Sequence, residues 1–424
     1  MAREMKDSGY FWIGEIPINW QIRKVKDLYQ MQTGFTPDSK NEEYYADEIE
    51  GFDWLTIGDL DGKRYIPKTT KNHISKLYIQ KFNPPIIPMG SLLYSFKLSV
   101  GQVSLTNRDI YSNEAIVSFL PCNDVCLDFL YYSSSMIVEN ANENIYGAKI
   151  LNQELIRNAW VVCPPIEEQK KIALFLDIKC AELDNVLEKT SASIEEYKKL
   201  KQAVITQAVT KGIIGDRKMK DSGIEWIGEI PIEWNIIRIK WILHERKEKS
   251  EYGEEEPLSM SQKYGIIPTK EMEIIPNMAS SFIGAKIVYS GDLVFNKLKA
   301  HLGVFAVSQY HGLVSPDYAV YHSRGIADVK YLEYLFKTPQ YIAEFRKRSS
   351  GVGAGLTRLY TDELYSIYCL LPSRNEQEEI ICYLNKKIKE IDNLIEKKEK
   401  YLSEIENYKK SLIYEYVTGK KEVP

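Results

Sequence analysis

The sequence lacks the long apolar runs that mark membrane proteins and secreted proteins. None of its apolar stretches approaches the roughly 20 residues that a transmembrane helix needs. Its opening residues, MAREMKDSGYFW, contain no apolar segment of the kind that a secretory signal peptide requires. We therefore expect a cytoplasmic protein with no membrane contact.

Cysteine and histidine are too sparse to suggest a metal centre or a disulfide scaffold. Of the six cysteines, only Cys122 and Cys126 lie close together, and neither a second pair nor a nearby histidine completes a metal site. The five histidines are scattered along the chain. Free thiols in a reducing compartment are the expected state, and we expect no metal and no cofactor.

The motifs of several common enzyme classes are missing as well. There is no Walker A phosphate loop, no Gly-x-Ser-x-Gly nucleophile elbow and no His-Glu-x-x-His metalloprotease helix. The segment Asn83-Pro84-Pro85 resembles the motif with which amino-methyltransferases hold a flipped base. However, Ile86 replaces the aromatic residue of that motif, and no glycine-rich turn for S-adenosylmethionine precedes it. A proline-stiffened loop is therefore the better interpretation.

A glycine cluster fails as a cofactor motif for a similar reason. Gly351, Gly353 and Gly355 superficially resemble a dinucleotide fingerprint, which requires a buried strand before it. The preceding residues 344–350 instead have the composition of a charged helix end. These glycines predict a mobile loop with a basic rim, which could lie against a phosphate backbone.

A basic excess, the usual electrostatic mark of a nucleic-acid-binding protein, is also missing. The net charge is −4, and residues 1–163 carry 16 basic against 20 acidic side chains, while residues 215–371 carry 20 of each. Neither segment should bind DNA strongly without sequence preference. Any recognition of DNA must depend on local clusters of basic residues or on a partner.

What the chain does contain is an internal repeat. Residues 5–20 and 219–234 are identical at 13 of 16 positions, at an offset of 214. A second pair of segments, beginning at Pro164 and Pro372, aligns without a gap at an offset of 208. The residues between these shared segments show little identity. The chain is therefore one unit built twice, and each copy encloses a divergent part between shared parts.

Each repeat ends in a segment that predicts a long helix. From Leu176 to Ala208, residues recur with the alternating four and three spacing of a coiled-coil seam, and adding 208 gives the same seam from Leu384 to Tyr416. Each helix begins with acidic residues after a proline-bearing turn and runs for about 44 residues, or ~66 Å. Because only one stripe of each helix is apolar, the natural partner of each seam is the other seam.

These features predict the organisation of the chain. We expect a globular domain at 1–163, a helix at 164–212, a second globular domain at 213–371 and a second helix at 372–424. Since the link after the first helix places the second domain at its far end, the second helix must run back. The expected product is an antiparallel helix pair with one domain at each end. Helices packed only on their own domains are the alternative, but strict heptads favour a helical partner.

Both globular segments predict mixed structure. Strand-like runs such as DWLTI, GSLLYSF, GQVSL and EAIVSFL, and later AKIVY, GDLVF, GVFAV and DYAVYH, are separated by turn residues. Helices are expected late in each segment, around 127–140 and 329–347. The predicted fold class is α+β, with two mixed α/β domains and a long antiparallel two-helix coiled coil.

Basic, aromatic, amide and hydroxyl side chains cluster in turn-rich stretches of both domains. Phosphates are contacted by Lys and Arg, whereas base edges are read by Arg, Lys, Asn, Gln and Ser. Each such residue alone is more often a solvated surface group, but parallel clusters in two duplicated domains are plausible DNA contacts. The candidates in the first domain are Thr36, Lys63, Arg64, Lys71, His73, Ser95, Lys97, Arg108, Asn113 and Lys149. The candidates in the second are Lys263, Tyr264, Asn296, Lys297, Lys299, His301, Arg346, Arg348 and Arg358.

The order of these segments resembles a known family. Each copy opens with Trp-Ile-Gly-Glu-Ile-Pro-x-x-Trp and closes with a proline-bearing turn, Glu-Gln and a long helix, as in the specificity subunit of type I restriction-modification enzymes. Residues 33–37 are similar to the family's Gly-x-Thr-Pro turn, and residues 54–60 are similar to its Trp-(x)n-Asp-Leu strand. The second domain has a Glu-rich stretch at 245–256 in place of a clear Gly-x-Thr-Pro turn.

The resemblance implies a division of labour between subunits. It implies that each domain is a target recognition domain reading one half of a bipartite sequence in double-stranded DNA. The helices would act as a spacer and as the docking site for two modification subunits, which bind S-adenosylmethionine and methylate adenine, and a restriction motor-nuclease subunit can join. The chain itself would then catalyse nothing. A non-enzymatic coiled-coil adaptor that binds proteins rather than DNA is the alternative.

Overall fold

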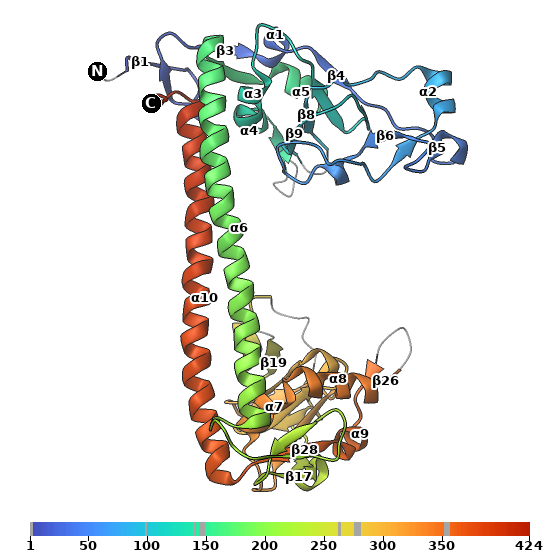
Figure 1. Cartoon of the computed structure of the whole chain (residues 1–424), viewed down its shortest axis with the longest axis vertical. Helices are drawn as coiled ribbons and strands as arrows, with labels where there is room; N and C mark the ends of the chain where they lie inside the picture. Colours follow the sequence, from blue (N-terminus) through green and yellow to red (C-terminus); the bar gives the residue numbers. More distant parts are fainter. Residues whose placement is uncertain are drawn as a thin grey trace. The chain divides into compact units, whose positions relative to one another are not determined.

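The computed structural model describes residues 3–97, 100–139, 141–143, 149–261, 264–274, 281–351 and 357–424. The chain forms two compact units. Unit 1 comprises Met1–Thr190 and Tyr401–Pro424, and unit 2 comprises Ser191–Lys400. Two long helices, α6 (Ile166–Lys211) and α10 (Arg374–Val417), each contribute one end to unit 1 and the other end to unit 2 (Figure 1).

The long helices form where the sequence signals predict. Helix α6 follows Pro164 and Pro165 and has Glu167 and Glu168 in its first turn, where the helix dipole favours acidic side chains. It ends before Gly212, whose φ of +81° is a left-handed conformation that favours glycine. The lengths of α6 and α10, 46 and 44 residues, confirm the prediction.

The predicted seam is the face along which the two helices meet in each unit. Every seam position in both helices is buried or half-buried. In unit 1, the ring of Phe175 lies 4.6 Å from that of Tyr416. In unit 2, the ammonium of Lys398 lies 5.8 Å from the ring of Tyr197. These contacts confirm an antiparallel pairing within each unit.

The polar seam positions form the same ion pair in both units. Lys409 Nζ lies 2.5 Å from Asp184 Oδ1 in unit 1, and Lys201 Nζ lies 2.7 Å from Asp392 Oδ1 in unit 2. Both the lysines and the aspartates are related by the offset of 208. The repeat in the sequence is therefore also a repeat of contacts.

Unit 1 is built on a central antiparallel sheet in the order β4-β11-β8-β9 and a distal sheet in the order β10-β6-β7-β5. Helix α2 and strand β5 lie on the side of the unit farthest from α6 (Figure 1). The strands are β1 (Met5–Asp7), β2 (Glu15–Pro17), β3 (Gln21–Lys24), β4 (Met31–Thr33), β5 (Tyr45–Ala46), β6 (Phe52–Leu55), β7 (His73–Ile74), β8 (Leu92–Ser95), β9 (Val103–Leu105), β10 (Tyr111–Ser112), β11 (Ile116–Phe119), β12 (Asn142–Glu143), β13 (Lys149–Ile150) and β14 (Trp160–Cys163). The shorter helices are α1 (Val25–Leu28), η1 (Glu42–Tyr44), η2 (Ile57–Asp59), α2 (Lys76–Phe82), α3 (Leu127–Ser133), α4 (Ser135–Val138) and α5 (Gln153–Asn158).

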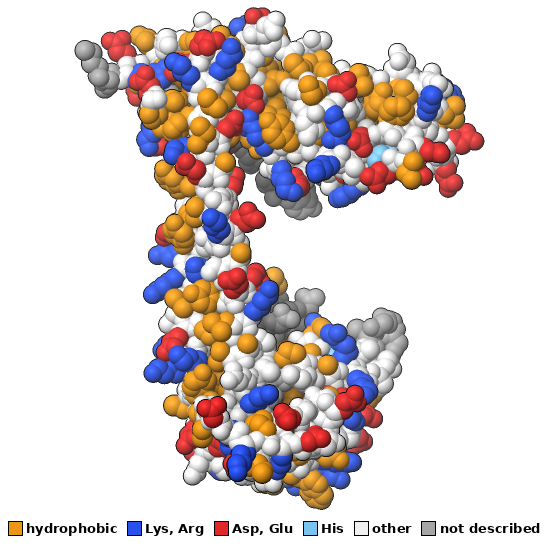
Figure 2. All heavy atoms as spheres, viewed as in Figure 1, with side chains coloured by type: hydrophobic (Ala, Val, Ile, Leu, Met, Phe, Trp, Pro, Cys, Tyr) orange, Lys and Arg blue, Asp and Glu red, His pale blue; other side chains and the backbone are white. Residues whose placement is uncertain are grey.

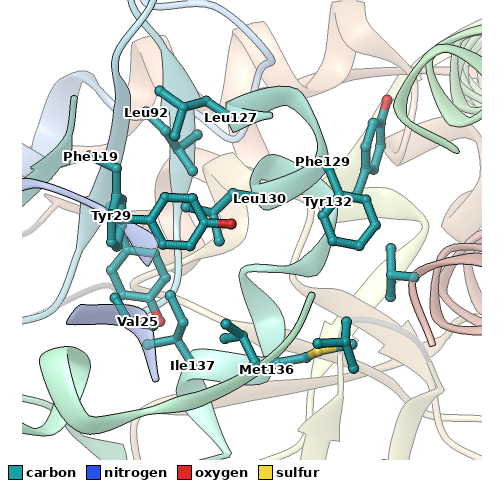
Figure 3. Packing of buried hydrophobic residues seen from close by; sticks show 14 of the residues in the cluster. Val25, Tyr29, Leu92, Phe119, Leu127, Phe129, Leu130, Tyr132, Met136 and Ile137 are labelled. Atoms are coloured by element: carbon teal, nitrogen blue, oxygen red, sulfur yellow. The ribbon is translucent and has the colours of Figure 1, made fainter. Parts of the chain in front are cut away.

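The core of unit 1 joins the central sheet to both long helices. Figure 3 shows Leu92 and Phe119 of the sheet packed with Leu130 of α3 and Tyr29. The same buried cluster includes residues from the start of α6, such as Leu176, and from the end of α10. The globular part and the helix ends therefore share one core.

Unit 2 repeats this central sheet in the order β18-β25-β22-β23. Its strands are β15 (Met219–Asp221), β16 (Glu229–Pro231), β17 (Asn235–Arg238), β18 (Leu243–Glu245), β19 (Leu258–Ser261), β20 (Gly265–Pro268), β21 (Lys286–Val288), β22 (Leu293–Asn296), β23 (Phe305–Val307), β24 (Gly312–Val314), β25 (Tyr318–Ser323), β26 (Ser350–Gly351), β27 (Thr357–Arg358) and β28 (Tyr368–Leu371). Its helices are η3 (Ile239–Trp241), η4 (Thr269–Glu271), η5 (Ala300–Leu302), α7 (Val329–Phe336), α8 (Pro339–Arg348) and α9 (Thr361–Ser366). Its core takes residues from the end of α6 and the start of α10, the reverse of unit 1.

The two units differ beyond the central sheet. Unit 1 has the four-stranded distal sheet and α2, which share an aromatic cluster containing Tyr44, Trp54 and Tyr78. Unit 2 has instead the pairs β19-β20 and β21-β24 in this part of its sequence. The structure therefore varies where the two copies of the sequence diverge, and the mixed α/β class with two long helices is confirmed.

The repeated tryptophan segment is a clasp on the long helix of its own repeat. Trp20 is fully buried, its Nε1 donates to Glu168 Oε2 at 2.9 Å, and Arg3 pairs with the same carboxylate. Trp234 likewise donates to Glu376 Oε2 at 2.9 Å. In each case a buried indole is tied to the first turn of a long helix, which explains why this segment is the best preserved part of the repeat.

A second contact, which we call the clamp, holds each globular part to its helix. Gln169 of α6 accepts from the backbone N–H of Cys126 at 3.1 Å, at the start of α3. Gln377 of α10 accepts from the backbone N–H of Asp328 at 2.8 Å, at the start of α7. Both glutamine side chains are buried, and both also donate to a proline carbonyl of the turn before the helix. The clamp is thus identical in the two units.

The structure also shows the Asn-Pro-Pro segment and the cysteines, and the described residues can be searched for metal sites and membrane helices. Asn83 is the C-cap of α2, with a φ of +43°, so the Asn-Pro-Pro segment is a helix end followed by a stiff loop. All six cysteines are free thiols. Among the described residues, no group of three or more His, Cys, Asp or Glu could hold a metal ion, and no helix has the length and apolarity needed to cross a membrane.

Candidate nucleic-acid interface

Four of the candidates in unit 1 converge where the strands of its central sheet end. Glu114 accepts from the hydroxyl of Thr36 and lies 3.3 Å from the ammonium of Lys97. Asn113 precedes this carboxylate, and Ser95 ends the neighbouring strand β8. Thr36 and Lys97 are exposed and Asn113 is half-buried, whereas Ser95 is fully buried, so a direct contact of Ser95 with DNA would require rearrangement.

The turn that carries Thr36 is fixed by a close backbone approach. A Cβ on Gly34 would lie 2.0 Å from the carbonyl oxygen of Ser112, so no other residue fits there without displacing β10. The indole of Trp54 donates to the carbonyl of Phe35 at 3.0 Å. The two motifs that resemble the specificity-subunit family therefore brace each other and present Thr36 at the surface.

A second brace positions Lys71. Asp59 is buried and forms a capping box with Thr56, and its other oxygen accepts from the backbone N–H of Lys71 at 3.0 Å. The ammonium of Lys71 is exposed and donates to the carbonyl of Gly58 at 2.8 Å. Lys71 is therefore a cation held on an ordered loop, which suits contact with a phosphate.

Two other candidates have structural partners. Arg108 Nε donates to Asp53 Oδ2 at 2.9 Å, and His73, which is buried, lies 3.2 Å from the same carboxylate. Although burial alone would raise the pKa of Asp53, hydrogen bonds from Arg108 and Thr70 lower it. This pairing of a charged carboxylate with Arg108 ties β6 to the loop before β10, and it argues against free DNA contact by Arg108 and His73.

Arg64 and Lys63 are neighbours with opposite environments. Lys63 is highly exposed and pairs with Asp61 at 2.6 Å. Arg64 is only 23% exposed and pairs with Asp128 and Asp177, from α3 and α6. Lys63 remains available at the surface, whereas Arg64 is turned toward the helix.

In unit 2, the candidate residues gather around η5. The backbone N–H of Leu359 donates to the carbonyl of Lys297 at 3.0 Å, and His301 Nδ1 lies 3.4 Å from the hydroxyl of Thr357. Asn296 ends β22, the counterpart of β8 in the central sheet. The stretches 95–97 and 296–299, chosen separately from the sequence, therefore occupy the same place in the two sheets.

The remaining candidates in unit 2 vary in exposure. Lys299, Arg346 and Tyr264 are exposed, as a DNA contact requires. Arg348 pairs with Glu344 at 2.6 Å, and Arg358 pairs with Asp317 at 2.6 Å, so both also stabilise the fold. Lys263 lies outside the described residues, and the side chain of Lys149 in β13 is also outside them.

Two basic residues beside Lys297 were not predicted from the sequence. Lys247, Lys297 and Arg324 line a pocket of about 530 Å³ in unit 2, which is also lined by the carboxylates of Glu245 and Asp362. Lys247 lies in the Glu-rich stretch 245–256, from which no DNA contact was predicted, and Arg324 lies in a turn after β25. Lys247 follows β18 and Arg324 follows β25, and the pairing of these two strands brings the two residues together. The sequence alone did not reveal this pairing.

Charge on the surface is mixed, as the composition implies. On the face drawn in Figure 2, the Lys and Arg side chains of each unit are interspersed with Asp and Glu. A surface of this kind attracts DNA weakly without sequence preference. Recognition would therefore depend on individual positioned side chains such as Thr36, Lys71 and Lys299.

Comparison with known proteins supports the resemblance seen in the sequence. Residues 17–196 match the family described as type I restriction modification DNA specificity domain. The chain is 24% identical over 428 residues to the type I restriction enzyme MjaVIII specificity subunit of Methanocaldococcus jannaschii, covering 96% of this chain and 93% of that protein.

Solved structures share the fold. A chain from a structure that concerns complex assembly and conformational transition of the type I R-M system aligns with a TM-score of 0.69 and 13% identity, covering 95% of this chain and 98% of that one. The HsdS subunit from Thermoanaerobacter tengcongensis aligns with a TM-score of 0.52 and 14% identity, covering 96% and 98%. At these identities the alignments establish the shared fold.

Proposed function

We propose that the chain is a specificity subunit of a type I restriction-modification system, because residues 17–196 match the DNA specificity domain of that family and the chain is similar to a curated specificity subunit over nearly its whole length. On this proposal, each of its units reads one half of a bipartite target in double-stranded DNA. The main support for this proposal is a contrast within the chain. We call the clasp, the clamp and the seam together the frame, which is repeated, and we call the globular parts that it carries the readers, which diverge. The clasp, the clamp and the seam recur in both units, while the parts beyond the central sheet differ. Such a chain can present two different recognition surfaces on one scaffold.

The readers are the globular domains at 1–163 and 213–371, and the helices at 164–212 and 372–424 form the spacer. In each reader, the exposed candidates near the ends of the central strands would contact bases and phosphates. A long two-helix spacer would fix the number of base pairs between the two half-sites, as the spacing of subunits does in dimeric DNA-binding proteins.

We further propose that the helices dock two modification subunits, and that restriction subunits can join this complex in the cytoplasm. The long helices expose apolar side chains outside the seam, including Leu174, Ile178 and Tyr408 in unit 1 and Leu200 and Leu394 in unit 2. On this proposal, the docked subunits would cover these exposed apolar side chains. Methyl transfer and cleavage would belong to these partners, and the chain itself would be non-catalytic.

The proposal is tested by sequencing the methylated bases of a host that expresses this chain with its cognate modification subunit. We expect a bipartite motif with methyl-adenine in both halves, and no methylation when either chain is expressed alone. A continuous motif, or no motif in the presence of both chains, would contradict the proposal. The second outcome would favour an adaptor that binds proteins rather than DNA.

A further inference from the structure

Unit 1 contains a charged junction that the proposed function does not use. Arg64 lies in the segment between β6 and β7 of the distal sheet. This segment runs beside β9, where the carbonyl of Arg64 accepts from the backbone N–H of Leu105 at 2.7 Å. Its guanidinium lies 2.5 Å from Asp128 Oδ1 of α3 and pairs with Asp177 of α6. The side chain of Arg64 thus connects the distal part of the unit to both α3 and α6.

The surroundings of this guanidinium fit a permanent structural contact. Its plane lies near the rings of Tyr131 and Tyr132, at 5.2 and 5.7 Å, and its side chain is 23% exposed. The hydroxyl of Tyr132 donates to Asp177 Oδ1 at 2.6 Å, so the acid is held by a neutral donor as well as by the cation. Arginine suits such a junction because its planar donors can bind two carboxylates at once, which a lysine ammonium does less well.

The equivalent position in unit 2 lacks the acid. Tyr334 of α7 donates to Asn385 Oδ1 of α10 at 2.6 Å, and Asn385 corresponds to Asp177 at the offset of 208. The tyrosine contact is therefore repeated, while the carboxylate that binds Arg64 is replaced by an uncharged amide. The charged junction is a feature of unit 1 and not a requirement of the frame.

We propose that Arg64 is a positioning residue that fixes the orientation of the distal sheet of unit 1 on α6, rather than a residue that contacts DNA. The consequence for DNA rests on the proposed function. If the reader is held rigidly on its helix, the distance between half-sites is strictly defined. If Arg64 is removed, the reader keeps its contact residues but tolerates more than one distance.

The orientation can be measured in the full chain without DNA. Spin labels on Lys76→Cys in α2 and Lys189→Cys in α6 report the distance between the distal part of unit 1 and the helix, with the exposed cysteines Cys122 and Cys382 replaced by serine. We expect a narrow distance distribution that becomes about twofold wider in Arg64→Ala, because a contact that restricts local motion is lost. An unchanged distribution would overturn the proposal.

Matched variants separate positioning from folding. Lys63→Ala removes the neighbouring, solvent-exposed ion pair and should leave the distribution unchanged. Asp177→Asn introduces the residue that the second repeat already has at this position, so it should fold, and it should widen the distribution to a smaller extent. Arg64→Lys should restore part of the order. If Arg64→Ala fails to fold, Asp177→Asn decides the outcome, and an unchanged distribution there contradicts the proposal.

The methylated motif gives a readout that loss of stability alone would not change. With Arg64→Ala, methylation should spread to sites whose gap differs by about one base pair, while both half-sites keep their sequences. Relaxation at a single base of one half-site, with an unchanged gap, would show that Arg64 reads DNA and would overturn the proposal. Absence of any motif with the unaltered chain would instead contradict the proposed function and leave the distance measurement as the test of Arg64.

Discussion

The two units share a frame and differ in what the frame carries. Each has a buried tryptophan bonded to a glutamate, a buried glutamine bonded to the start of a helix, and a lysine paired with an aspartate across the seam. Beyond the central sheet, unit 1 has a second sheet and unit 2 has separate strand pairs. The repeated residues make the contacts that hold each unit together, and on the proposed function the divergent parts would carry the sequence specificity.

Removing the tryptophan of the clasp should cause the largest loss of stability, and the loss should be similar in the two units. Trp20→Ala and Trp234→Ala each remove a fully buried side chain and leave a glutamate without its indole donor. We expect each to lower the free energy of unfolding of its own unit by about 3–5 kcal/mol. Denaturant titration with hydrogen exchange resolved by unit measures this loss. Effects that differ greatly between the two variants would contradict the claim that the clasp stabilises both units in the same way.

The clamp should show a smaller but still matched effect. Gln169→Leu and Gln377→Leu each remove the acceptor of a half-buried backbone N–H and the amide donor to a proline carbonyl. We expect a loss of about 2 kcal/mol in either unit. The measurement is the same titration, and the surface variant Gln340→Leu serves as a control. A neutral Gln169→Leu variant would mean that the clamp in unit 1 does not hold α3.

Acid should weaken unit 2 through Glu333, which is more deeply buried than Asp53, the carboxylate of unit 1 whose pKa is also lowered. Although burial alone would raise the pKa of Glu333, Lys337 and Lys330 lower it below its ordinary value of 4.5. Its charge therefore stabilises unit 2 above that pH, and this stability is lost as the pH falls through the lowered pKa. We expect Glu333→Gln to cost about 1–2 kcal/mol at neutral pH and less in acid. A cost that stays constant down to pH 3 would contradict this assignment.

The seam ion pairs should contribute least. Lys201 and Lys409 pair with half-exposed aspartates, so solvent and salt screen both interactions. We expect Lys201→Met and Lys409→Met each to change stability by less than about 1 kcal/mol, by equal amounts in the two units. Thermal unfolding at low and high salt measures this. A large and salt-independent loss in one variant would show that its lysine has a different role.

Local patterns predicted the long helices, their seam and the strands well, because the signals for each element lie close together in the chain. The clasp and the clamp were not predicted, since each joins residues far apart in the chain. The heptad seam, the acidic first turns and the strand-like runs all correspond to elements of the structure. The partners of individual side chains were not predictable in this way. Arg64 and Asp128 are 64 residues apart, and Arg108 and Asp53 are 55 apart. Without the fold, a paired arginine and a free one have the same appearance in a sequence.

The same limit explains the outcome for the candidate DNA contacts. Thr36, Lys71 and Lys299 are exposed, whereas Ser95 and His73 are buried in strands β8 and β7. A polar residue type in the sequence did not reveal on which side of a strand the side chain lies. The strand pairing that aligned 95–97 with 296–299 could not be derived from residues that share little identity. Contacts with bases therefore remain predictions for both units.

The most direct test of the central claim is an exchange of one reader within the intact frame. Residues 27–162 would be replaced by the corresponding segment of another specificity subunit, with Arg64 and Asp128 kept so that their junction with Asp177 is preserved. The methylated motif would then be determined with the same modification subunit. The account predicts that one half of the bipartite motif changes while the other half and the gap stay the same. A change in both halves, or in the gap, would contradict the division between a repeated frame and independent readers.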